Sequence, residues 1–316
     1  MMFLDTLKLT FNNVNLLWKV LLYHLICIVL VSGVTVAICY PLITNLSSAG
    51  FFADIVGLVE QNMFNLRLDQ TLVTVADIIN KFIDIVVSDL PLYLPYTIAG
   101  IAMLAIFGEF LGGLAEIPTK ECLYGYMGSW SRLGFMGCYI KNLGRSVKYS
   151  LVKLLVVLPF DLLLVAGIIS LMYLYKLGFM WSVFAPFLII LALTLFIAIR
   201  QVLFGGWASA IIVKNKRVFE GLRAGIHSYS KAFGRVFSLA ISVVLMVIAL
   251  NIMAITLTAS VGLIIAVPLS LIFIYTFNMV AYFYTNGLRF YIDKNKIVSP
   301  RKIEDFESMY ALKDII

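Results

Sequence analysis

The chain has 316 residues, of which 62% are hydrophobic and 13% are charged, and its formal net charge is +7. Soluble domains carry about 25% charged residues, so this composition excludes a soluble globular protein with a polar surface. The basic residues lie between long apolar segments, so the positive charge indicates membrane topology and not nucleic-acid binding.

Six apolar segments are long enough, or nearly so, to cross ~30 Å of hydrocarbon. The first, residues 21–40, reads LLYHLICIVLVSGVTVAICY, and no small-x-small cleavage site follows it. We therefore expect a retained helix and not a signal peptide. The others are Leu92–Ile117, Ser150–Tyr173, Phe179–Ile199, Val236–Leu257 and Leu263–Tyr284. Together they predict an all-α, polytopic membrane bundle with six spans.

The inner end of the fourth span is open to two interpretations. Its apolar run continues past Arg200 to Val213. Either one long tilted helix or a span that breaks near Gly205–Gly206 would fit this pattern.

Lys and Arg are distributed unequally between the predicted loops. With the N-terminus inside, only three of the 24 basic residues, Arg67, Lys81 and Lys176, fall on the outer side, which leaves 21 on the inner side or at inner helix ends. Cytosolic loops carry the excess of Lys and Arg. We therefore expect a multi-pass protein of the cell membrane with both termini, including the tail 289–316, in the cytosol.

Residues 41–91 form the largest predicted external segment. It is acidic, with carboxylates at Asp54, Glu60, Asp69, Asp77, Asp84 and Asp89. Apolar residues recur at helical spacing at Phe52, Val56, Val59 and Met63, and again at Leu72, Val75, Ile79, Phe82, Ile83 and Val86. This pattern predicts two amphipathic helices that lie on the outer leaflet or cap the bundle. They would serve as a packing hairpin or as a ligand-binding lid.

A seven-residue pattern occurs twice, ninety positions apart, and each copy precedes a span. The copies are Tyr139-x-Lys141-x-x-Gly144-Arg145 and Tyr229-x-Lys231-x-x-Gly234-Arg235. With MMFLDTLKLTFNNVNLLWK as a degenerate third copy, they predict three two-span units, each with a cytosolic amphipathic segment and an elbow at glycine. The units are 1–117, 118–213 and 214–288, within a single membrane domain. The pattern indicates either a structural anchor or a docking surface for a soluble partner or anionic headgroups.

The stretch GGWASAIIVKNKRVFEGLRAGIHSYSKAFGRVFSLAISVVLM resembles bacterial six-span proteins related to the membrane domain of glycerophosphoryl diester phosphodiesterases. Positions comparable to the family's pattern are Glu220, Ala224, Ser228 and Arg235. The weaker stretch MGSWSRLGFMGCYIKNLGRSVKYSLVKLL resembles the corresponding earlier unit. The resemblance implies a helical membrane module, sometimes fused to a phosphodiesterase. It carries no catalytic residues to this chain, in which we expect no phosphodiesterase domain.

Ionisable residues within apolar spans are costly and are candidates for function. Those in this chain are Glu109, Glu116, Asp161 and Arg200. Asn251 in the fifth span matches Asp161 at the ninety-residue offset, and it completes a candidate polar site. We expect Glu109 or Asp161 to neutralise Arg200, with Glu109 favoured for its depth; otherwise Arg200 reaches the inner headgroups. Both a packing ion pair and a polar cavity for a headgroup, an ion or a proton are consistent with this pattern.

Catalytic and metal-binding patterns are weak. The two histidines, His24 and His227, lack other metal ligands nearby in the sequence, and His24 is expected to be a hydrogen-bonded packing residue. We predict no catalytic residue, no metal site and no cofactor. The favoured function is a non-enzymatic, transport- or envelope-related module that binds membrane lipids, or partner proteins at its cytosolic loops. The alternatives are a permease subunit energised by a separate ATPase and a lipid-modifying membrane enzyme.

Overall fold

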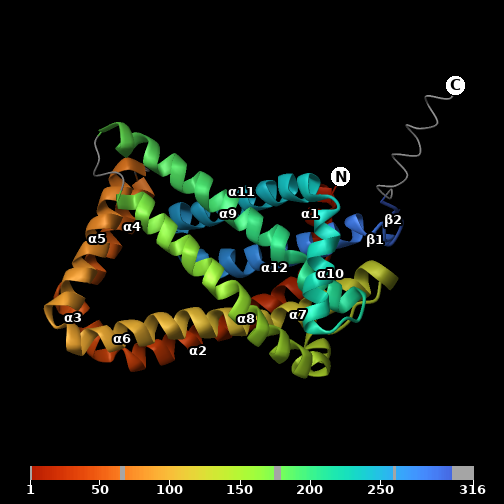
Figure 1. Cartoon of the computed structure of the whole chain (residues 1–316), viewed down its shortest axis with the longest axis horizontal. Coiled ribbons are helices and arrows are strands. Elements are labelled where there is room, and N and C mark those ends of the chain that lie inside the picture. Colours follow the sequence, from red (N-terminus) through yellow and green to blue (C-terminus); the bar gives the residue numbers. More distant parts are fainter. Residues whose placement is uncertain (1, 65–67, 174–178, 259–260, 301–316) are drawn as a thin grey trace.

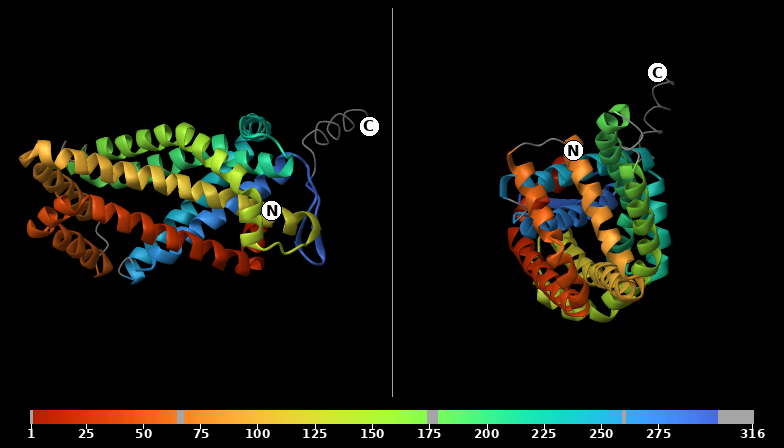
Figure 2. Two further views of the ribbon diagram at one scale, coloured as in Figure 1. Left: turned by 90° about the horizontal axis from the view of Figure 1, so that it is seen from below. Right: turned by 90° about the vertical axis from the view of Figure 1, so that its left-hand side faces the viewer.

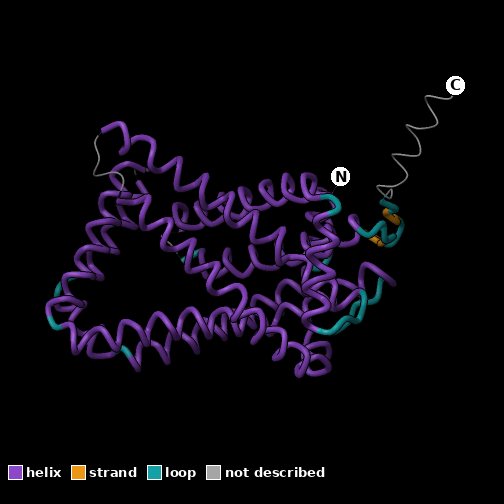
Figure 3. The backbone as a smooth tube through the Cα atoms, viewed as in Figure 1, coloured by secondary structure: helices purple, strands orange, loops and turns teal. Residues whose placement is uncertain are grey.

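The computed structural model describes residues 2–64, 68–173, 179–258 and 261–300, which are almost entirely helical (Figures 1 and 3). In chain order the elements are α1 (Met2–Asn12), α2 (Val14–Ile38), α3 (Tyr40–Ser48), α4 (Phe51–Phe64), α5 (Leu68–Ser88), α6 (Leu90–Ala102), the π-helical turn η1 (Met103–Phe107), α7 (Gly108–Ser129), α8 (Phe135–Tyr173), α9 (Phe179–Val213), α10 (Val218–Ser230), α11 (Phe233–Thr258), α12 (Leu263–Thr285), β1 (Phe290–Asp293) and β2 (Lys296–Val298). The two strands form an antiparallel hairpin.

Within the described residues, six helical segments are long and apolar enough to cross a membrane. They are Val14–Ile38, Leu90–Ser129, Phe135–Leu171, Phe187–Val213, Phe233–Ile255 and Leu263–Thr285. Most carry large apolar side chains exposed on the protein surface, as expected where lipid is the solvent. The bent pair formed by α3 and α4 would add a seventh span if it crossed the membrane as one unit. The prediction of an all-α, polytopic membrane protein is confirmed.

Several of the spans belong to helices that are longer than the predicted segments; α7, for example, continues past Ile117 to Ser129. α8 begins at Phe135 and not near Ser150, and α9 continues without a break to Val213. The fourth span is therefore part of one long helix, as the first of the two interpretations predicts, and α9 does not break near Gly205–Gly206. Polar residues at a helix end do not prevent helix formation, because helix propensity and hydrophobicity are different properties.

Helix α12 lies at the centre of the bundle, where it contacts α1, α2, α7, α9, α10 and α11. Every residue from Tyr275 to Phe283 is buried. The main hydrophobic cluster gathers at this end of α12, together with α1, α10 and the β-hairpin. Asn12 Nδ2 donates a hydrogen bond of 2.9 Å to the Ile292 carbonyl, so α1 and β1 lie at the same end of the molecule (Figure 2).

The helices α4 and α5 are the predicted amphipathic pair. Lys81 Nζ lies 2.5 Å from Asp54 Oδ2 and joins them, while Ala76 and Val86 on α5 are buried. α5 contacts α8 and α9, and α4 contacts α11, so the pair caps the end of the bundle that lies away from α10 (Figure 1). Arg67, Lys176 and residues 301–316 lie outside the described residues, as do the side chains of Val59, Met63 and Leu72.

The two copies of the seven-residue pattern have different backbone conformations. Residues 139–145 lie inside the continuous helix α8, with no elbow at Gly144. In the second copy α10 ends at Ser230 and α11 begins at Phe233, so the bend comes before Gly234. The prediction of an elbow at glycine is therefore wrong. A Cβ atom on Gly144 or Gly234 would meet nothing within 4 Å, so no close contact requires glycine at either position.

The close approach of α10 to α9 does require glycine. A Cβ atom on Gly225 would lie 2.7 Å from the carbonyl carbon of Gly206 and 2.8 Å from the amide nitrogen of Trp207. The indole nitrogen of Trp207 also donates a 2.7 Å hydrogen bond to the Val218 carbonyl and fixes the start of α10. α10 is thereby anchored along the C-terminal part of α9, beside the site described next.

Candidate functional site

Three neighbouring helices, α7, α8 and α9, bring six charged side chains together inside the bundle. We call this set the ion ladder. In order of contact it consists of Asp161, Arg200, Glu109, Lys153, Glu116 and Lys120. The sign of the charge alternates along the ladder and the formal charges cancel, which offsets part of the cost of removing them from water.

Arg200 lies at the first end of the ladder between two carboxylates. Its Nε is 2.8 Å from Asp161 Oδ1, and its Nη2 donates a hydrogen bond of 3.0 Å to Asp161 Oδ2. Nη2 also lies 3.5 Å from Glu109 Oε1. The predicted neutralisation of Arg200 inside the bundle is confirmed, so it does not reach out to the headgroups. The preference for Glu109 is wrong, because Asp161 is closer and binds through both oxygens.

Lys153 explains why Glu109 is the weaker partner of Arg200. Its Nζ lies 2.8 Å from Glu109 Oε1, at the centre of the ladder, and 3.1 Å from Glu116 Oε2. A single ammonium group therefore links the two carboxylates of α7. Since these carboxylates lie seven residues apart, about two turns, they share one face of α7.

Glu116 is the most heavily engaged carboxylate. Its Oε1 accepts a hydrogen bond of 2.8 Å from Lys120 Nζ, and its Oε2 accepts one of 2.9 Å from the Tyr149 hydroxyl. Lys120 Nζ also donates to the Gly205 carbonyl of α9 at 3.1 Å. These contacts satisfy the closed end of the ladder and tie α7 to both α8 and α9.

Burial rises steadily along the ladder. The side chains of Asp161, Arg200, Glu109, Lys153, Glu116 and Lys120 are 31%, 23%, 21%, 13%, 5% and 0% exposed, respectively. The Arg200 end is therefore partly open, while the Lys120 end is sealed in the core. A ligand would reach the open end without breaking the closed one.

The helices depart from regular α-helical geometry at two places, each close to a carboxylate that contacts Arg200. The π-helical turn η1 comes directly before Gly108 and Glu109. A π turn inserts an extra residue and shifts the helix face that follows, and such turns are frequent at functional sites. On α8, Pro159 lies two residues before Asp161 and removes a backbone hydrogen bond. Each irregularity thus lies two residues before a carboxylate that contacts Arg200.

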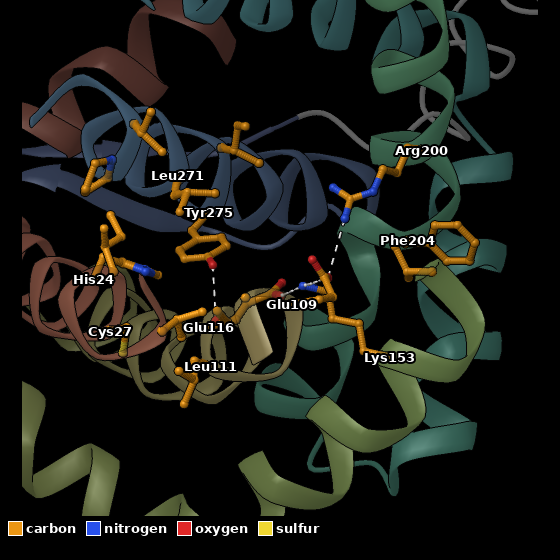
Figure 4. A pocket seen from close by; sticks show the side chains of 18 of the residues that line it. His24, Cys27, Glu109, Leu111, Glu116, Lys153, Arg200, Phe204, Leu271 and Tyr275 are labelled. Atoms are coloured by element: carbon orange, nitrogen blue, oxygen red, sulfur yellow. Dashed lines mark hydrogen bonds and ion pairs between the residues drawn. The ribbon is translucent and has the colours of Figure 1, made fainter. Parts of the chain in front are cut away.

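The ladder forms one wall of a cavity of about 380 Å³ between α2, α7, α8, α9 and α12 (Figure 4). Its charged lining comes from Glu109, Glu116, Lys153 and Arg200. The apolar lining includes Leu104, Leu111, Val157, Phe204, Leu271 and Ile274. The volume falls within the range of ~300–1,000 Å³ typical of small-ligand sites, and the lining is amphipathic.

Two buried polar side chains in this cavity have unpaired atoms. His24 Nε2 and Asn278 Oδ1 make no hydrogen bond within the described part of the chain, although His24 is 6% exposed and Asn278 is 2% exposed. Buried polar atoms are normally paired, so each such atom calls for an explanation. The predicted hydrogen bond of His24 is not found at Nε2. In Figure 4 its imidazole lies on the α2 side of the cavity, across from Glu109 and Arg200.

Asn251 does not belong to this site. Its Nδ2 donates hydrogen bonds of 3.0 Å to Ser270 Oγ and 2.7 Å to the Val247 carbonyl. It therefore joins α11 to α12, whereas Asp161, its counterpart at the ninety-residue offset, joins α8 to α9. The matched positions carry polar residues in both spans but have different partners.

The residues of the seven-residue pattern lie outside the cavity and have unequal surroundings. In the first copy, Tyr139 packs against the rings of Tyr23 and Phe135. In the second copy, Tyr229 is fully buried and its hydroxyl donates a 2.8 Å hydrogen bond to the Asn278 carbonyl. The remaining positions are exposed in both copies: Lys141, Gly144, Arg145, Lys231, Gly234 and Arg235. Only the second tyrosine is therefore fully buried.

Comparisons with protein-family models, with curated proteins and with solved structures find no match for this chain. The resemblance to the membrane domain of glycerophosphoryl diester phosphodiesterases therefore stays a prediction. The function is inferred from the geometry of the cavity and the ladder.

Proposed function

We propose that the protein is a non-enzymatic module of the cell membrane that holds the polar head of an amphipathic molecule, such as a membrane lipid, in the cavity lined by the ion ladder. The observation that carries this proposal is the pairing of a charged wall with an apolar wall between membrane spans. A polar head would contact the ladder while an acyl chain followed the apolar side chains.

The charge balance of the site favours a zwitterionic or neutral polar head. The six ladder charges already cancel, so a ligand with a net charge would bring in an uncompensated charge. His24 Nε2 and Asn278 Oδ1 have no hydrogen-bond partner in the described part of the chain, and both side chains line the cavity, so a small rotation of either would let it hydrogen-bond to such a head. Their pairing with a ligand would account for two buried atoms that otherwise carry a desolvation cost.

The same proposal places α10, both termini and the basic loops in the cytosol, and the capping pair α4 and α5 outside. Of the 24 basic residues, only Arg67, Lys81 and Lys176 fall on the outer side in this orientation, as the positive-inside rule requires. Reporter fusions at Ile316 and near Glu60 should therefore report opposite sides of the membrane. The same side for both fusions would refute this topology.

Filling the cavity tests the binding function. Gly112 lines the cavity, and a Cβ atom there would meet nothing within 4 Å, so Gly112→Leu would occupy cavity space without a backbone clash. We expect the full chain, purified in mild detergent, to retain lipid that native mass spectrometry detects. Gly112→Leu should reduce that retention several-fold.

Gly167→Leu is the matched control, because Gly167 is an exposed glycine on α8 with equally open surroundings and does not line the cavity. It should retain lipid as the wild type does. Equal lipid retention by Gly112→Leu and Gly167→Leu would contradict the proposed function.

A further inference from the structure

A second cavity, of about 690 Å³, lies at the surface where α8 meets the loop that precedes α10. Four basic side chains line it, and no described carboxylate does; the cations are Arg145, Lys148, Lys216 and Arg217. We call this cavity the basic groove. It shares no lining residue with the cavity of the ion ladder.

Most of the positive charge in the basic groove is uncompensated. Lys148 and Arg217 form no ion pair with any residue that the structure describes. Arg145 Nη2 donates a 2.8 Å hydrogen bond to the neutral amide oxygen of Asn215, which keeps its charge available. Lys216 Nζ is 3.9 Å from Glu220 Oε2, and both side chains are about half exposed, so this pair contributes little.

The start of α10 adds to the positive potential. Arg217 is the N-cap residue of this 13-residue helix, and no side chain caps the helix by a hydrogen bond. Val218 and Phe219, the first two residues of the helix, line the groove. The backbone N–H groups of a first helical turn favour an anion. The groove therefore combines four cations with an uncapped helix N-terminus.

Apolar surface continues from the groove along α8. Leu151 lines the groove and is 50% exposed, and Leu155, one turn further on, is 75% exposed. At 1.5 Å per residue, Leu155 lies about 10 Å along the helix from Lys148. Along α8, the cations are thus followed by exposed apolar side chains. A phospholipid has the matching arrangement, a charged headgroup followed by acyl chains, whereas a soluble anion has no apolar part.

We propose that the basic groove binds the phosphate headgroup of an anionic phospholipid, with an acyl chain along Leu151 and Leu155. Arg145, Lys148 and Arg217 contact the phosphate. Because the groove is separate from the cavity of the ion ladder, this binding does not depend on the function proposed above. Gly112→Leu should leave it unchanged.

The test compares two double variants of the full chain in mild detergent. Lys148→Gln with Arg217→Gln removes two groove cations that hold no ion pair with a described residue. Lys231→Gln with Arg235→Gln removes the same charge from exposed residues of the second pattern copy, outside the groove. Binding of phosphatidylglycerol and of phosphatidylcholine is measured for both variants. The groove variant should lose about tenfold or more of its affinity for phosphatidylglycerol, and the control should stay within about twofold of the wild type.

Three results would overturn the proposal. The first is an equal loss of phosphatidylglycerol binding in both variants, which would indicate diffuse interfacial charge. The second is complete displacement of phosphatidylglycerol by inorganic phosphate at a concentration equal to that of the lipid, which would indicate a site for a free anion. The third is unchanged phosphatidylglycerol binding in the groove variant. A loss of binding to an acidic peptide in that same variant would then indicate a protein-docking site.

Discussion

Replacing Glu116 by Gln is expected to lower the free energy of unfolding by about 3–5 kcal/mol, the cost of leaving a buried charge unpaired. Lys120 is fully buried 2.8 Å from Glu116, and its other polar contact is the Gly205 carbonyl. Lys153 would keep its ion pair with Glu109 but lose its ion pair with the carboxylate of Glu116. Thermal unfolding of the purified protein in mild detergent measures this effect.

The matched control for this substitution is Glu220→Gln. Glu220 is an exposed glutamate 3.9 Å from Lys216, and its loss should change the stability by no more than about 0.5 kcal/mol. The double variant Glu116→Gln with Lys120→Met should lose less than the sum of the two single variants, because it removes both members of a pair. Glu116→Gln and Glu220→Gln with the same melting temperature would show that the ladder does not stabilise the fold.

Replacing Arg200 by Gln is expected to cost about 2–3 kcal/mol, somewhat less than the loss of Glu116, because this end of the ladder is partly open. Arg200 holds Asp161 by two contacts of 2.8 and 3.0 Å. Its removal would leave Asp161 without a described cation partner. A double-mutant cycle with Asp161→Asn should give a coupling energy of about 1–3 kcal/mol.

Asn251 provides the control for this cycle. It occupies the position that matches Asp161 at the ninety-residue offset but contacts Ser270 and not Arg200. The effects of Arg200→Gln and Asn251→Ala should therefore add to within about 0.5 kcal/mol. If the effects of Arg200→Gln and Asp161→Asn on the free energy of unfolding also added, the contacts between Arg200 and Asp161 would not be energetically coupled.

The spans could be predicted from the sequence because apolar length is a direct consequence of bilayer thickness. The extension of α8 back to Phe135 could not be predicted from apolar length, because the residues before Ser150 are amphipathic. Packing against α7 stabilises this part of the helix. The capping pair α4 and α5 was predicted from helical periodicity. Its place at the end of the bundle depends on contacts with α8, α9 and α11, which periodicity does not specify.

The ion ladder could be predicted only in part. Glu109, Asp161 and Arg200 stand out because they interrupt apolar runs. Lys120 and Lys153 lie near the ends of the predicted apolar segments, and counting basic residues for topology treats every Lys near a span end as solvated. Their burial follows from the packing of three helices. The i, i+4 spacing of Glu116 and Lys120 was the signal that would have placed this lysine opposite a carboxylate.

The repeated pattern shows the limit of inference from spacing. Gly144 and Gly234 have equally open surroundings, yet one lies within a continuous helix and the other follows a bend. Glycine permits a bend but does not require one. The repeat does not distinguish Gly225, where a side chain would clash with the α9 backbone, because this requirement arises from contact between α9 and α10.

The proposed function requires an amphipathic molecule in the cavity beside the ion ladder. An experimental structure of the full chain in a lipid nanodisc tests it most directly. We predict non-protein density in the cavity, with a polar head within hydrogen-bonding distance of His24 Nε2 and of the open end of the ladder at Arg200, and an elongated chain along the apolar wall. A cavity that is closed by the surrounding spans, or that holds only water, would contradict this account.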